Sequence, residues 1–137
     1  MDRSAVKAIV DREIESLMKR LGIQHWTVAV RYEPEAERPD GQIRRGFCSP
    51  NLDYNTAAIQ FNPEAFHTEE EVLYVLRHEL LHVVLSPYDL YKNALAPVLD
   101  TDPAKVEVFA VLWTHVIEKA VINLNRMYLG LTQKDEP

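Results

Sequence analysis

Residues 68–85 read TEEEVLYVLRHELLHVVL, and this stretch has the pattern of a buried helix. Thr68 and Glu71 have the spacing of a capping box, in which each side chain accepts a hydrogen bond from the other residue's backbone N–H. Three glutamates in the first turn suit the positive end of the helix dipole. The chain reaches Pro87 soon afterwards, and a proline clashes with a continuing helix. Apolar residues between these limits fall on almost every side, which is typical of a helix packed inside a domain.

His78 and His82 lie four positions apart, so both imidazoles should project from one face of this helix, about one turn apart. That spacing suits two ligands of a single zinc ion. Glu79 is about 100° round from His78, within reach of a water bound to such an ion. Zinc held by neutral imidazoles lowers the pKa of that water towards ~7, and a carboxylate beside it can act as general base.

The pattern H-E-x-x-H therefore predicts a zinc hydrolase. The alternative is two core histidines beside an accidental glutamate. Burying three such groups in apolar surroundings without partners would cost free energy, and this favours the metal site.

Length and composition restrict the class of protein. A chain of 137 residues is predicted to form one domain over 1–137 with a core of its own. The balance of 15 basic against 21 acidic residues, with a pI near 5.3, argues against a nucleic-acid-binding surface. One cysteine excludes a disulfide framework and fits a reducing compartment. No apolar run approaches the ~20 residues of a membrane span, and the first residues do not resemble a signal peptide. We expect a cytoplasmic protein.

The rest of the chain predicts an α+β domain: an N-terminal helix, a three-stranded, mainly antiparallel sheet, the motif helix and a C-terminal helix. The first helix should be capped by Ser4 and stopped by Gly22. The last should start at Asp102-Pro103 and end near Gly130, with a frayed tail over 130–137. The strands are expected at 25–32, 42–49 and 56–61, and the helices at 4–21, 68–85 and 103–128.

A catalytic zinc site usually has three protein ligands and one open position. Our choice for the third ligand is Glu107, because this glutamate has apolar neighbours in the first turns of the last helix. Glu118 lies on nearly the same angular face, about three turns along. Four alternatives stay open: Asp89, Asp102, His115 and Glu118.

Other residues invite a functional interpretation. Cys48 could be a thiolate ligand, but a lone cysteine in a strand is more often a small buried hydrophobic residue. His25 is expected at the surface. Tyr88 or Tyr91 could donate to an oxyanion, but aromatic packing with a surface hydroxyl is the more common role of such residues.

With a glutamate 25 residues further on, His78, Glu79 and His82 resemble the gluzincin group of zinc metallopeptidases. The order of elements is most similar to its minimal members, the minigluzincins and ImmA/IrrE-type domains. The resemblance implies zinc bound by His78, His82 and Glu107, with Glu79 as general base. It also implies a peptide or protein substrate bound along an edge strand at 56–61.

Two other families fit less well. A metzincin needs a glycine where this chain has Leu85, and a SprT-like peptidase would carry a cysteine-rich zinc module. We therefore expect a zinc-dependent endopeptidase. The alternative is a metal-containing domain that binds or regulates a partner protein without general proteolytic activity.

Overall fold

The computed structural model describes residues 1–34, 41, 43–90, 94 and 103–134. The chain forms two compact units, Met1–Val84 and Leu85–Pro137, which are described in turn. The elements are those of a small α+β protein with an N-terminal helix, a three-stranded sheet and a C-terminal helix, as predicted.

The first unit begins with helix α1, Arg3–Arg20. Its N-cap is Asp2, whose carboxylate accepts a hydrogen bond from the backbone N–H of Ala5 at 2.8 Å. The prediction that Ser4 caps this helix is therefore wrong, because the acidic residue two positions earlier takes that role. The predicted stop at Gly22 is confirmed, since this glycine has a φ of +72°.

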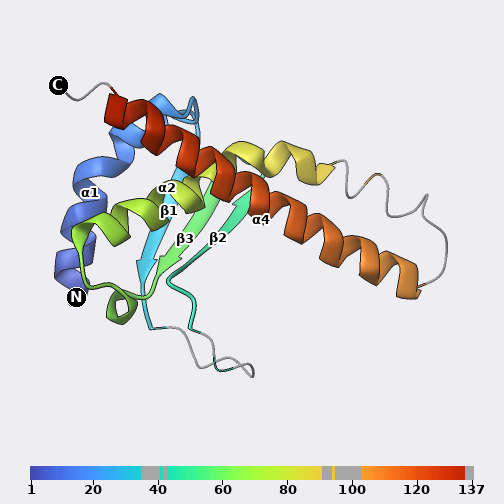
Figure 1. Ribbon diagram of the computed structural model, residues 1–137, viewed down its shortest axis with the longest axis horizontal. Helices are drawn as coiled ribbons and strands as arrows, with labels where there is room; N and C mark the ends of the chain where they lie inside the picture. Colours follow the sequence, from blue (N-terminus) through green and yellow to red (C-terminus); the bar gives the residue numbers. More distant parts are fainter. Residues whose placement is uncertain (35–40, 42, 91–93, 95–102, 135–137) are drawn as a thin grey trace. The chain divides into compact units, whose positions relative to one another are not determined.

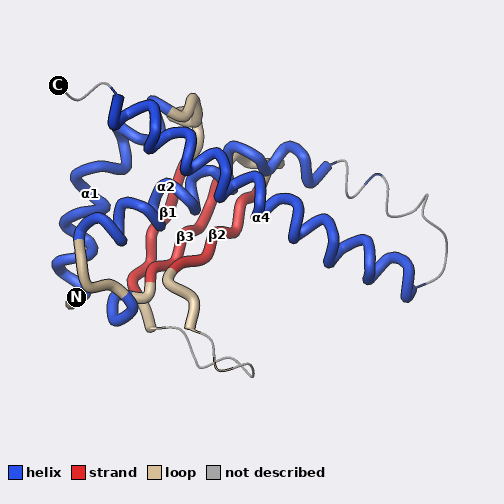
Figure 2. The backbone as a smooth tube through the Cα atoms, in the orientation of Figure 1, coloured by secondary structure: helices blue, strands red, loops and turns tan. Residues whose placement is uncertain are grey.

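The sheet consists of β1 (Thr27–Tyr32), β2 (Gly46–Asn51) and β3 (Thr56–Phe61), in the order β1-β3-β2 (Figure 2). Strand β3 pairs in parallel with β1 and antiparallel with β2, so the sheet is mixed. Ile59 in β3, for example, is opposite Val30 on one side and Cys48 on the other.

The position of β3 corrects one expectation. The segment 56–61 is the central strand, with neighbours along its whole length, and the prediction that it is an edge strand is wrong. Its burial explains the position: Ala57, Ile59 and Phe61 are 5%, 0% and 0% exposed, and a central strand covers such side chains best. The edges are β1 and β2.

Strand β2 is also displaced from its predicted range of 42–49. Pro50 and Asn51, which lie beyond the predicted range, belong to the strand. A proline is tolerated there because β2 is an edge strand and one of its sides needs no ladder hydrogen bonds. Residue 42 lies outside the described residues.

The core of this unit lies between one face of the sheet and two helices, α1 and α2 (Glu69–Leu85) (Figure 1). The sheet contributes Ile59 and Phe61, and the Phe61 ring stacks on Tyr32 with centroids 6.0 Å apart. The residues of α1 and α2 that are 0% exposed are Val6, Val10, Val72, Leu76 and Leu80. The opposite face of the sheet is more open, since Phe47 is 48% exposed.

The second unit contains a short 3-10 helix, η2 (Ser86–Tyr88), and the long helix α4 (Pro103–Lys134). Pro103 starts α4 as predicted, whereas Asp102 lies outside the described residues. The predicted end near Gly130 is wrong, because α4 continues to Lys134. A glycine costs a helix only about 1 kcal/mol, which 31 other residues can offset. No helix in the described part of the chain is long and apolar enough to cross a membrane.

Candidate metal centre

The motif helix α2 starts as the sequence predicts. The backbone N–H of Glu71 donates to the Thr68 hydroxyl at 3.2 Å, and Glu71 accepts in return from the N–H of Thr68 at 3.4 Å. Glu71 also accepts from the backbone N–H of His67 at 2.8 Å. These N–H groups, that of His67 first, hold the pKa of Glu71 below its ordinary value because they favour the charged carboxylate. The capping box therefore fixes where α2 begins.

His78 and His82 lie side by side on one face of α2. Their ring centroids are 5.2 Å apart, the rings are inclined at 62°, and both side chains are half-buried. The predicted common face is thus confirmed. The spacing also fits two ligands of one metal ion, because each imidazole has a nitrogen that can reach a shared point between the rings.

Glu79, the predicted general base, is buried beside the edge strand β2. Only 6% of the residue is exposed. A Cβ atom built on Gly46, the first residue of β2, would lie 3.2 Å from Oε1 of Glu79. The carboxylate therefore lies directly against the start of this strand, in the same unit as the two histidines.

Cys48 lies two residues further along β2, in the same part of the structure as Gly46 and Glu79. Burial raises the pKa of its thiol to about 12, and the negative charge of Glu79 adds to that effect. Cys48 is thus held as a neutral, half-buried thiol, as expected for a small hydrophobic residue in a strand.

The candidates for a third ligand lie in the second unit, where burial changes along one face of α4. Glu107 is exposed. Glu118 lies eleven residues, or about three turns, further along the same face and is half-buried. Val121 and Asn125 continue that face and are both 0% exposed. Glu118 therefore lies where this face becomes covered, whereas Glu107 does not.

The other residues considered as ligands or functional groups differ in exposure and in hydrogen bonding. His115 is exposed, and Asp89 accepts a hydrogen bond from Nε1 of Trp113 at 3.2 Å. His25 is exposed beside the Trp26 ring, as predicted for a surface residue. Tyr88 is 51% exposed. Asp102 and Tyr91 lie outside the described residues.

Sequence reasoning missed Gly46. Besides the contact with Glu79, a Cβ atom at this position would lie only 2.7 Å from Cγ1 of Val75 in α2. The glycine is needed because strand and helix approach too closely for any side chain. The available signal was a glycine at the start of a strand pattern, which often marks such an approach.

No protein-family model, curated protein or solved structure matches this chain.

Proposed function

We propose that this protein is a zinc-dependent peptidase in which Glu79 is the general base. One observation carries the proposal: two paired imidazoles, four residues apart, and a buried carboxylate lie on α2 next to an edge strand. Paired imidazoles select zinc and similar ions, and a buried glutamate that is not a ligand suits proton transfer. The single cysteine is consistent with a reducing compartment, and we place the protein in the cytoplasm.

In this proposal His78 and His82 hold the ion together with a carboxylate from α4. Glu107 is the choice from sequence. We prefer Glu118, because it is half-buried where one face of α4 becomes covered. A ligand needs such shielding, since an exposed carboxylate stays solvated and binds a metal ion weakly.

The residues then have distinct tasks. A bound zinc ion supplies a Lewis acid that polarises the scissile carbonyl and acidifies water in the site. Glu79 takes a proton from the attacking water and hands it to the departing amine. Its burial against Gly46 fixes the carboxylate, so the proton moves over a short and constant path.

An extended peptide can be held by β2. This strand is paired with β3 on one side only, so its other side offers backbone N–H and C=O groups to an added strand. Glu79 lies so close to Gly46 that a Cβ atom there would touch its carboxylate, so a peptide on this edge has its carbonyl groups near the general base. We therefore propose β2, and not 56–61, as the strand that binds substrate.

The test combines metal content with proteolysis. Purified protein should contain about one zinc ion per chain by elemental analysis, and it should produce new N-termini in an unfolded protein mixture, detected by mass spectrometry. Zinc in stoichiometric amount without new termini would overturn the peptidase and leave a metal-containing binding domain. Absence of stoichiometric metal would overturn the metal centre as well.

A further inference from the structure

Strand β1 is the other edge of the sheet, and its outer side carries unused backbone groups. The backbone N–H groups of Thr27 and Glu33 each donate at 3.0 Å to a carbonyl on the β3 side. Alternate residues of a strand turn to the same neighbour, so Val28 and Val30 turn away from β3. In the part of the chain that the structure describes, no other strand pairs with that side. The N–H and C=O groups of both valines are thus open to an added strand.

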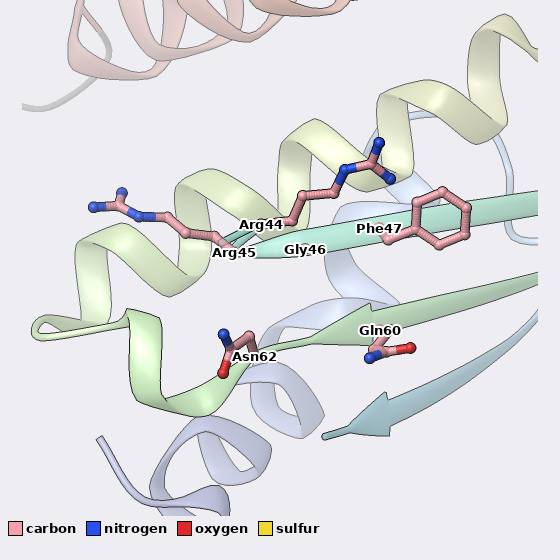
Figure 3. A pocket seen from close by; sticks show the side chains of 6 residues that line it. All are labelled: Arg44, Arg45, Gly46, Phe47, Gln60 and Asn62. Atoms are coloured by element: carbon pink, nitrogen blue, oxygen red, sulfur yellow. The ribbon is translucent and has the colours of Figure 1, made fainter. Parts of the chain in front are cut away.

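The edge of β1 lacks the features that usually protect a free edge, which are prolines, charged side chains and bulges. Strand β2 has two of them, which protect it while no substrate is bound: Pro50 lies within the strand, and Figure 3 shows Arg44 and Arg45 at its start. Strand β1 reads TVAVRY, carries its one charge on Arg31 near the end, and pairs with β3 over its whole length without a bulge. Such a flat edge favours the addition of a further strand.

A pocket of about 510 Å³ opens beside this edge, lined by α1, β1 and the segment that joins them. Its volume is within the range of ~300–1,000 Å³ that is typical of ligand pockets. The apolar lining residues are Ile14, Met18, Trp26 and Val28. Glu15 and Lys19 are exposed lining residues of opposite charge, so these two together add no net charge. The pocket therefore suits an uncharged, apolar side chain.

Val28 connects the edge to the pocket, since it belongs to both. It pairs with Ala57 of β3, and Ala57 is buried on the face of the sheet that packs on α1 and α2. Side chains of residues that lie opposite each other in paired strands are on the same face. The residue of an added strand opposite Val28 thus directs its side chain to the face of α1, where the pocket lies.

We propose that β1 and this pocket bind an extended segment of a partner protein by strand addition, with a large apolar side chain in the pocket. A second copy of β1 does not supply that side chain. The large residues on its corresponding face, Trp26 and Tyr32, are 7% and 6% exposed, and Val28 and Val30 are too small to fill the pocket. The edges β1 and β2 lie on opposite sides of β3, about 10 Å apart, so the site is separate from the proposed substrate strand.

The first experiment measures binding of labelled peptides. Glu79→Gln protein, which should not cut the probe, is titrated with fluorescein-labelled Ser-Val-X-Val-Ser amides, and anisotropy reports the Kd values. The peptide with phenylalanine at X should bind at least ~10-fold more tightly than that with alanine, because its ring is buried. Glutamate or lysine at X should give no gain over alanine. Equal affinity of the phenylalanine and alanine peptides would overturn the proposal, whether or not the protein is a peptidase.

Amide hydrogen exchange, followed by NMR, locates the bound peptide. The phenylalanine peptide at saturation should slow exchange of Val28 and Val30 at least ~10-fold, because their N–H groups become hydrogen-bonded. Gly46 and Cys48 are the controls: they turn away from β3 on the other edge, since the carbonyl of Arg45 accepts from the backbone that follows β3. Protection of these controls in place of the valines would overturn the assignment to β1. So would protection of the valines in the free protein that rises with protein concentration, because it would place a second copy there.

Backbone substitutions test strand addition itself. Val28→Pro removes an outward N–H group, and an edge strand accepts proline, so the variant should keep its circular dichroism spectrum and bind the phenylalanine peptide at least ~10-fold more weakly. N-methylated peptides decide the matter on Glu79→Gln protein if Val28→Pro does not fold. Methyl groups on one alternate set of peptide amides should abolish binding, and those on the other set should not, since every second N–H of an added strand faces β1. Binding that tolerates both sets would overturn strand addition.

Discussion

Gly46 lies close to Glu79 where β2 packs on α2, with room for no side chain between them. A Cβ atom at position 46 would lie 3.2 Å from Oε1 of Glu79, and it would lie still closer, 2.7 Å, to Cγ1 of Val75. The edge strand β2 and the buried carboxylate of Glu79 are thereby held so close that one added side chain would fill the space between them. The proposed chemistry needs this closeness, because the strand presents the substrate and the carboxylate moves the proton.

Replacing Gly46 with alanine should destabilise the protein and impair catalysis. The added methyl group overlaps Val75, and inserting a methyl group into a packed site costs about 1–3 kcal/mol. Relief of the overlap must move β2 or the Val75 side chain, and a shift of β2 would also displace it from Glu79, so hydrolysis should fall by more than the lost stability explains. The free energy of unfolding is measured by urea denaturation. Gly130→Ala is the matched control: no atom lies within 4 Å of its built Cβ, and it should stabilise α4 by about 0.5–1 kcal/mol.

Replacing Glu79 with glutamine should keep the zinc and lower turnover at least ~10²-fold. The amide has the same shape, but it cannot accept a proton from water. Metal content by elemental analysis and kcat on an unfolded substrate are the two measurements. Glu70→Gln removes the same charge from the exposed first turn of α2 and should change neither. A Glu79→Gln variant with wild-type turnover would refute the role of general base.

The parts of the site that follow from local sequence could be predicted. The capping box of Thr68 and Glu71 and the common face of His78 and His82 depend on residues three or four positions apart, and both are confirmed. The periodicity of a helix fixes such relationships whatever surrounds it. The α+β class follows in the same way from alternating and helical patterns along the chain.

Relationships between distant segments could not be predicted. Strand order depends on which pairing buries most surface, and β3 takes the central place although it follows β2 in sequence. The predicted strand ended before Pro50, but an edge strand accepts this proline. The importance of Gly46 depends on Val75, a residue 29 positions away, so the glycine in the strand pattern could indicate a close approach but not which residue approaches it. The choice between Glu107 and Glu118 likewise needed the burial along α4.

Comparing two glutamates of α4 identifies the third ligand. Glu118→Gln should weaken zinc binding at least ~100-fold. Loss of a residue that only hydrogen-bonds to a metal ligand weakens binding about 10–100-fold, and loss of the ligand itself should cost more. Glu107→Gln should leave the affinity unchanged, because that side chain is exposed. Competition with a chromogenic chelator measures both Kd values. The reverse result would establish Glu107, the choice made from sequence, as the ligand.

The thiol of Cys48 should be unreactive in the folded protein. Its pKa of about 12, against an ordinary value of 9.0, leaves ~10³-fold less thiolate at pH 8 than in an unfolded chain. Reaction with a chromogenic disulfide should therefore be slower by that factor than in denaturant. The rate in the native protein should also rise with pH across the range up to the raised pKa. Equal rates in the folded and unfolded protein would show that Cys48 is neither buried nor close to a negative charge.

Loss of the carboxylate of Glu71 should remove part of the stability of the protein at neutral pH. The pKa of Glu71 is lowered in the folded state, first by the N–H of His67, so its contribution is complete above the unfolded value of 4.5 and is lost as the pH falls through the folded one. Glu71→Gln should thus be less stable than wild type at pH 7, and the difference should shrink below pH ~4. Thermal unfolding followed by circular dichroism at several pH values measures this. Glu70→Gln removes a charge from the same turn but keeps the capping-box hydrogen bonds, so it should not reproduce the pH-dependent difference. If the stability difference between Glu71→Gln and wild type stays constant from pH 7 to pH 3, the charge of Glu71 contributes nothing to the cap of α2.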